Sequence, residues 1–209
     1  MGNGYETIAK LLTDRSVRRP WQVDVIRAYC GSILDPENNT PQVLWLISQG
    51  CDGKSVFTSA LSQAMRELHL GPKSSWPVEL KRNMRITSDE RQALLLIDAY
   101  CRKPDIFRYG LGKLKNLSAK VLVHSNQPPI LEYGMYNVIP IDWHASDEYL
   151  RKEGLMYGNG GFRGDNAFRE RVFNEMPAFL KDCEEAYKRL CPDRGLVRVP
   201  TEILENYWE

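Results

Sequence analysis

The sequence predicts an α/β fold with a central, mostly parallel sheet flanked by helices and a C-terminal helical piece. Short, continuous apolar runs recur along the chain, as expected for strands that are buried on both faces. Segments with helical periodicity lie between several of these runs. At 209 residues, of which 43% are hydrophobic and 26% charged, the chain is long enough to bury one core of this kind.

The first half of the chain alternates helix and strand. A helix is predicted to open at the segment PWQ, residues 20–22, because proline is favoured in a first helical turn. After a polar loop over 35–41, the apolar run VLWLI at 43–47 predicts a buried strand, and a second helix is expected over 56–68. In the first helix the apolar residues recur every four positions, as Trp21, Val25, Tyr29 and Ile33.

Three further strands are predicted in the second half, at the apolar runs 93–98, 121–124 and 138–141. Pro140 favours an edge position for the last of them, because proline cannot donate to a strand ladder. Helices are expected over 106–116, over 168–190 with a break or fresh start at Pro177, and in a short piece near Pro200. We expect residues 1–150 to form the core and residues 151–209 a C-terminal helical extension.

The most informative motif is SQGCDGKS at residues 48–55, which ends in Gly-Lys-Ser between a strand and a helix. A phosphate-binding loop is built in this way: its backbone N–H groups and the helix N-terminus favour phosphates, Lys54 supplies a point charge, and Ser55 reaches Mg²⁺. The motif departs from the usual pattern because Ser48 stands where the first glycine is expected, and Gly50 lies two residues further on. The alternative is a plain strand-to-helix turn with a solvated lysine.

Polar residues also follow the next two strands in chain order, Asp98 and then Asn126. Because the carboxyl ends of parallel strands line one edge of a sheet, we expect these residues to converge on Lys54. Asp98 has the form of an acid that holds the Mg²⁺ shell, and Asn126 is placed to contact a γ-phosphate or its attacking water. Taken singly, Asp98 is equally a helix cap or solvated strand end, and Asn126 a turn former before two prolines.

Composition limits the partners and the kinds of site. The net charge of +1 and a pI near 7.6 predict no polyanion partner from overall electrostatics, and the basic runs at 15–19 and 113–120 are expected to be solvated surface. Five scattered cysteines without a C-x-x-C pair, and three distant histidines, argue against a disulfide framework or a zinc site. No apolar run approaches the roughly 18 residues of a membrane span, so we expect a soluble, intracellular protein without a signal peptide.

The order of these motifs resembles the core of superfamily-3 helicases. That group includes the helicase halves of Rep proteins from small circular single-stranded DNA viruses and the primase–helicases of phages and plasmids. The resemblance covers about residues 20–190. It is carried by the phosphate loop, the acid-ending strand, the segment SNQPP at 125–129, PWQ at 20–22, VIPI at 138–141 and the acidic, proline-containing NEMPAFL at 174–180.

The resemblance implies an AAA+-like P-loop NTPase that binds ATP and Mg²⁺. It implies a homo-oligomeric ring that draws single-stranded nucleic acid through its pore, in viral or plasmid DNA replication. Lys54, Asp98 and Asn126 would be catalytic, with Asn126 as the polar sensor, and Ser55 and Asp98 would hold the metal, Asp98 through water. The nucleotide-binding residues would be Gly50, Cys51, Asp52, Gly53, Lys54, Ser55 and Val56.

Three departures from that family weaken the expectation of catalysis. Ala99 stands where many members carry a second acid that activates water. The segment 133–137 contains no arginine finger, a group worth about 10³–10⁵ in rate in related phosphoryl transfer. The segment 99–120 leaves little room for the basic hairpin that contacts DNA. Arginines that could substitute for the finger are Arg163, Arg169 and Arg171.

Three hypotheses therefore stand. The first is an active ATPase that moves single-stranded nucleic acid. The second is a catalytically degenerate relative that keeps the fold and serves as a structural or regulatory subunit of a larger assembly. The third, a small-molecule kinase, has weaker support because it would require an arginine-rich lid, and the glycine-rich segment 154–164 offers only Arg163.

Overall fold

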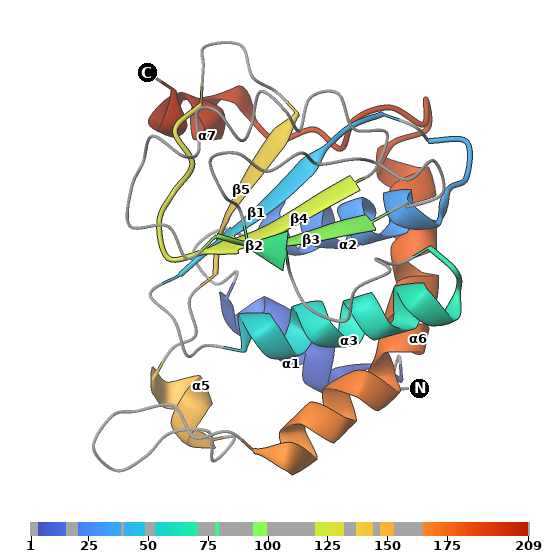
Figure 1. Cartoon of the computed structure of the whole chain (residues 1–209), viewed down its shortest axis with the longest axis vertical. Coiled ribbons are helices and arrows are strands. Elements are labelled where there is room, and N and C mark those ends of the chain that lie inside the picture. The colour runs from blue at the N-terminus through green and yellow to red at the C-terminus, as the bar shows by residue number, and fades with distance from the viewer. Residues whose placement is uncertain are drawn as a thin grey trace.

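A five-stranded parallel sheet runs through the described part of the chain (Figure 1). The computed structural model describes residues 4–15, 21–38, 40–48, 53–70, 78–79, 94–99, 120–131, 137–143, 147–152 and 165–208. Its strand order is β2-β3-β4-β1-β5. The strands are β1 (Val43–Ile47), β2 (Val78–Glu79), β3 (Leu94–Ala99), β4 (Lys120–Ser125) and β5 (Val138–Asp142).

The four predicted strands are confirmed, and so is their parallel pairing. β1 has the predicted bounds, while β3 and β4 differ from the prediction by one residue at each end and β5 by one residue at its C-terminal end. Pro140 lies in β5, which stands at one end of the described sheet. This position was predicted because proline has no backbone N–H to donate to a neighbouring strand. The two-residue strand β2 was not predicted, because the polar segment around it carries no alternating pattern.

The described helices are α1 (Glu6–Arg15), α2 (Trp21–Leu34), α3 (Lys54–Glu67), α5 (Asp147–Lys152), α6 (Asn166–Leu190), α7 (Thr201–Leu204) and the short 3₁₀ helix η1 (Glu205–Tyr207). The sequence predicted α2, α3, α6 and α7, but not α1 or α5. The predicted helix over 106–116 lies outside the described residues. In the described residues, no helix combines the length and the apolar character that crossing a bilayer requires.

α6 is a single helix of 25 residues, so the expected break at Pro177 is wrong. Pro177 is exposed, and the turns on either side of it are anchored in the core by Met176, Phe179 and Leu180. Burying three large apolar side chains offsets the roughly 3 kcal/mol that an internal proline costs a helix.

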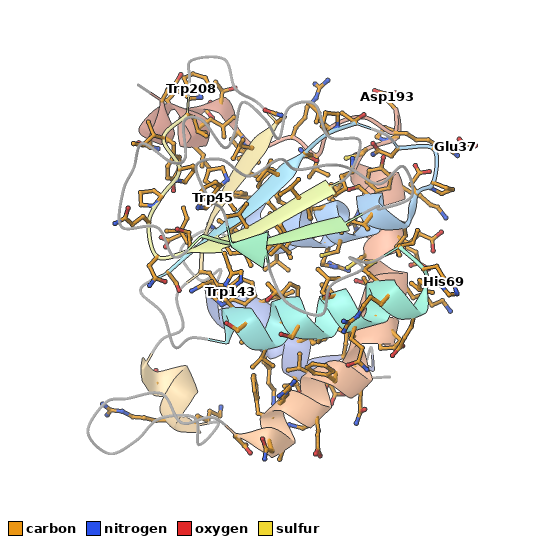
Figure 2. The ribbon with its side chains drawn as sticks, in the orientation of Figure 1. Glu37, Trp45, His69, Trp143, Asp193 and Trp208 are labelled. Carbon is orange, nitrogen blue, oxygen red and sulfur yellow. The ribbon has the colours of Figure 1, made fainter. Side chains whose placement is uncertain are left out.

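One hydrophobic cluster joins α1, α2, α3 and α6 to one face of the sheet. Figure 1 shows α3 below the sheet, and the long α6 packs against α1, α2 and α3. Trp143 lies between the sheet and α3 (Figure 2), where its ring centroid is 5.3 Å from that of Phe57. The strand residues in this cluster alternate along each strand and are Leu44, Leu46, Leu122, Ile139 and Ile141.

The α2–α6 crossing depends on Gly31. A Cβ atom at this position would lie 2.1 Å from the Cys183 carbonyl oxygen and 2.7 Å from the Tyr187 Cβ. Those distances are closer than real atoms approach, so the helices can meet here only because residue 31 has no side chain. Beside the crossing, the Arg27 guanidinium forms an ion pair with the Asp182 carboxylate.

The other face of the sheet carries Trp45, which is fully buried. Its indole N–H donates to the Gln127 carbonyl at 3.2 Å. The chain after β4 then contacts the C-terminal end, because the Leu131 N–H donates to the Tyr207 carbonyl at 2.8 Å and Leu131 forms a parallel bridge with Trp208. The C-terminal helices thus lie beside the segment that follows β4 (Figures 1 and 2).

Candidate functional site

The carboxyl ends of β1, β4 and β3 lie next to one another at one edge of the sheet. In the strand register Ile47 pairs with Ser125, and Ser125 pairs with Ala99. One row earlier, Asp98 pairs with His124. Since neighbouring strands are about 4.8 Å apart, the backbone of Asp98 lies roughly 10 Å across the sheet from β1.

The turn into α3 has the backbone geometry of a tight loop that ends at a helix. Gly53 has φ 85° and ψ 0°, a left-handed conformation that favours glycine, and its carbonyl accepts the Phe57 N–H at 3.0 Å. Lys54 is the first helical residue. The first turn of α3 contains no acidic side chain, so among the residues of this turn no carboxylate offsets the positive end of the helix dipole.

Lys54 is 5% exposed, and its ammonium donates a hydrogen bond to the Ser48 hydroxyl. Ser48 is itself 1% exposed, and its backbone N–H donates to the Ser125 carbonyl at 3.1 Å. The alternative of a solvated lysine is therefore wrong. Sequence reasoning treated Ser48 only as a departure from the glycine pattern, although a hydroxyl six residues before the lysine was itself a signal for a buried acceptor.

The remaining residues of the predicted loop differ in position. Ser55 is exposed on the first turn of α3, where its carbonyl accepts the Thr58 hydroxyl at 3.4 Å. Val56 is half-buried and packs against the core. The other three predicted binding residues, Gly50, Cys51 and Asp52, lie outside the described residues.

Asn126 directly follows β4 and is exposed. The preceding Ser125 is buried, and its hydroxyl accepts the Gln127 N–H at 3.1 Å, which fixes the start of this loop. His124, one residue earlier, is buried and stands in register between Leu46 and Asp98. Sequence reasoning weighed the histidines only as metal ligands and missed this position, although a histidine at the end of an apolar run could have suggested it.

β5 ends at the same edge. Asp142 pairs in register with Ile47, and the Trp143 N–H donates to the Ile47 carbonyl at 2.7 Å. Asp142 was not predicted as a site residue. Within the described ranges, no group of three or more His, Cys, Asp or Glu side chains is arranged to hold a metal ion.

Lys120 lies at the opposite, amino edge of the sheet and is 2% exposed, so the expectation that the basic run 113–120 is solvated is wrong for this residue. Its ammonium donates to the Asn38 side-chain oxygen at 2.9 Å and to the Thr40 carbonyl. Burial lowers the pKa of Lys120 from 10.5 to about 8, although the nearby Asp35 carboxylate opposes this shift.

The Asn38 amide extends this polar contact to the C-terminal part of the chain. It donates to the Tyr187 hydroxyl of α6 and, at 3.5 Å, to the Gly195 carbonyl. We call Asn38, Thr40, Lys120 and Tyr187 the amino-edge cluster. Glu37, labelled in Figure 2, forms an ion pair with Arg194 at this edge.

The two described candidates for a substitute arginine finger lie on the first turns of α6. Arg169 and Arg171 are exposed, and their guanidinium carbons lie 5.2 Å from the Phe173 ring centroid and 5.9 Å from that of Phe168. Arg163 and the segments 132–136 and 153–164 lie outside the described residues. So does the segment 100–119 in which the DNA-contacting hairpin was expected to be shortened or missing.

No protein-family model and no curated protein matches this sequence. The fold, however, is similar to solved structures of the NrS-1 C-terminal region, residues 305–718, in the apo state. One has a TM-score of 0.67 at 11% identity and covers 97% of this chain and 51% of that chain. Two others have a TM-score of 0.60 at 10% identity and cover 97% of this chain and 51% and 50% of theirs.

This similarity shows that the chain shares an α/β fold with the NrS-1 C-terminal region. At 10–11% identity the likeness shows the fold alone. The chain spans about half the length of the solved structures it resembles.

Proposed function

We propose that this chain is a nucleotide-binding, superfamily-3 helicase-like domain that couples ATP and Mg²⁺ to the remodelling of nucleic acid in DNA replication. The observation that carries the proposal is Lys54, a buried lysine at the junction of β1 and α3 that directly follows the left-handed Gly53. The fold shared with the NrS-1 C-terminal region supports it. The strand order also supports it, because β4 and β3 bring Asn126 and Asp98 to the edge where this junction lies.

Each predicted site residue has a role in this proposal. The phosphates of ATP bind at the N-terminus of α3, where the helix dipole favours negative charge. Lys54 neutralises the β- and γ-phosphates, and Ser55 offers its exposed hydroxyl to Mg²⁺. Asp98 holds the metal through water, and Asn126 contacts the γ-phosphate. Mg²⁺ takes its other oxygens from water and phosphate, as is usual for this ion.

One specific observation favours a second candidate, a catalytically degenerate subunit. β3 ends in Asp98-Ala99, so the position after the metal-binding acid has no carboxylate to activate water. In this version the chain binds ATP but does not hydrolyse it, and it serves a larger protein assembly. In the first version a homo-oligomeric ring hydrolyses ATP and moves single-stranded nucleic acid.

Calorimetric titration with Mg·ATP tests the nucleotide site. We expect wild type to bind ATP and Lys54→Ala to bind it a hundredfold or more weakly. The matched control is Lys181→Ala, which removes an exposed lysine on α6 and should leave the affinity unchanged. A wild-type protein without affinity for ATP, or equal affinity in wild type and Lys54→Ala, would end the proposal.

Steady-state phosphate release separates the two candidates. Turnover that rises with single-stranded DNA and disappears in Asp98→Ala and Asn126→Ala identifies an active ATPase. ATP binding without turnover, with or without DNA, identifies the degenerate subunit. Sedimentation of the ATP-bound protein measures its oligomeric state and so shows whether it assembles into a ring by itself.

A further inference from the structure

Ser48 and Lys54 form a buried pair across the predicted phosphate loop. The Lys54 ammonium donates to the Ser48 hydroxyl, and the two residues are 5% and 1% exposed. Ser48 is also fixed through its backbone, because its N–H donates to the Ser125 carbonyl at the end of β4. The hydroxyl that meets the ammonium therefore lies on a segment tied to the sheet.

A glycine at position 48, as the usual motif has, would offer no side-chain acceptor. A buried ammonium requires hydrogen-bond acceptors, since its charge has lost the solvation of water. A lysine side chain also has many rotamers, and confining them before a ligand arrives removes part of the entropy cost of binding. The hydroxyl in this chain thus supplies both an acceptor and a constraint on Lys54.

We propose that Ser48 is a positioning residue for Lys54: its hydroxyl holds the ammonium in place so that Lys54 meets the phosphates of the nucleotide already oriented. This inference rests on the proposed function. An ammonium has three N–H donors and the Ser48 hydroxyl engages one of them, so this contact does not by itself exclude a phosphate oxygen at the same nitrogen.

The contribution of Ser48 to binding affinity should depend on whether the ligand carries phosphates. Because Ser48 acts through Lys54, its removal should weaken ligands that carry β- and γ-phosphates and leave a nucleoside unaffected. A hydroxyl that instead competes with phosphate for the ammonium would have the opposite effect, since its removal would tighten the binding of ATP.

The test titrates ATP and adenosine into wild type, Ser48→Ala and Ser48→Gly by calorimetry. We expect both variants to bind ATP about tenfold more weakly, within the range for a hydrogen bond to a charged group, with adenosine affinity within twofold of wild type. Ser48→Gly restores the residue that the usual motif carries and so keeps the loop compatible with folding. The matched control is Ser62→Ala, because Ser62 is a buried serine, in this case on α3, whose hydroxyl has no hydrogen-bond partner among the described residues.

A double-mutant cycle with Lys54→Ala gives the deciding readout. If Ser48 acts through Lys54, adding Ser48→Ala to Lys54→Ala should change ATP affinity less than twofold. Unchanged or tighter ATP binding in Ser48→Ala, an equal loss for adenosine, or a full tenfold loss in the Lys54→Ala background would overturn the inference while leaving the ATP site intact. A wild type that binds no ATP would instead overturn the proposed function, and the inference with it.

Discussion

Lys54 and Lys120 are both almost fully buried, yet they lie at opposite edges of the same sheet and have different surroundings. Lys120 at the amino edge donates to Asn38 and Thr40, and Asn38 in turn donates to Tyr187. Lys54 at the carboxyl edge donates to Ser48. Lys54 is also the first residue of α3, whose first turn has no acidic residue.

The contrast shows how surroundings assign different roles to one residue type. In the amino-edge cluster the acceptors are themselves bonded to α6 and to the segment after it, so the ammonium joins distant parts of the chain. At the carboxyl edge, a left-handed glycine and an uncapped helix N-terminus adjoin the lysine, and these features favour an external anion. We therefore expect Lys120 to contribute to stability, and under the proposed function we expect Lys54 to bind the ligand.

Replacing each lysine in turn by methionine should give the largest expected difference, which is a difference in ATP affinity between the two variants. Lys54→Met should lower ATP affinity a hundredfold or more, equivalent to about 3 kcal/mol, because the phosphates lose their point charge. Lys120→Met should leave ATP affinity within twofold of wild type. Calorimetry measures both, with circular dichroism as the check on folding. Equal losses in the two variants would show that the edges do not differ in function.

Asn38→Ala tests the amino-edge cluster by removing the side-chain oxygen that accepts from the Lys120 ammonium. The substitution leaves a buried ammonium and the Tyr187 hydroxyl without this side chain, so unfolding free energy should fall by about 2–3 kcal/mol. Urea denaturation measures it, with Asn174→Ala, an exposed asparagine on α6, as the control. A loss no larger than the control's would contradict the structural role of the cluster.

Stability should depend on pH through Lys120. Its pKa is about 8 in the fold and 10.5 in the unfolded chain, so between these values the unfolded state binds more protons and stability rises with pH. From pH 7.5 to 9.5 the gain should be about 2 kcal/mol.

Other groups titrate in the same range and must be subtracted. Burial raises the pKa of Tyr29 and Cys183, which lowers stability as pH rises. The measured quantity is therefore the difference in unfolding free energy between wild type and Lys120→Met at each pH. Parallel curves for the two proteins would show that burial does not perturb Lys120.

Tyr187→Phe should give the smallest effect. It removes only the hydroxyl that accepts the Asn38 amide, so we expect a loss of about 1 kcal/mol in unfolding free energy. Tyr207→Phe on η1 is the matched control. If the loss in Tyr187→Phe equals that in Asn38→Ala, the contact with α6 rather than the contact with Lys120 dominates the cluster.

The parts of the molecule that sequence reasoning found are those set by neighbouring residues. The bounds of β1 and the presence of α3, which begins at Lys54 rather than at the predicted residue 56, follow from an apolar run and a Gly-Lys-Ser turn within a dozen positions. Lys120 was assigned to the surface because its partner Asn38 lies 82 positions away, and nothing local predicts that contact. The course of α6 through Pro177 likewise depends on packing against α2 and α3 rather than on helix propensity.

At the candidate site, the convergence of strand ends was predictable because parallel pairing fixes it. The Ser48–Lys54 contact was missed although its members are only six positions apart, since the motif directs attention to glycine at that place. Asp142 was missed because its position beside Ile47 follows from the strand register, which the sequence does not give. The roles of Lys54, Asp98 and Asn126 stay predictions.

The absence of a side chain at Gly31 has a consequence for both Lys54 and Lys120. The residue before Cys30 and Gly31 is Tyr29, whose hydroxyl donates to the Val121 carbonyl of β4 at 2.6 Å. A methyl group at position 31 would force α2 away from α6, and the tyrosine would transmit that displacement to β4. Because this one strand begins at Lys120 and ends at Ser125, a single added carbon atom in the helical layer would disturb both the amino edge that holds Lys120 and the carboxyl edge where we propose the nucleotide site.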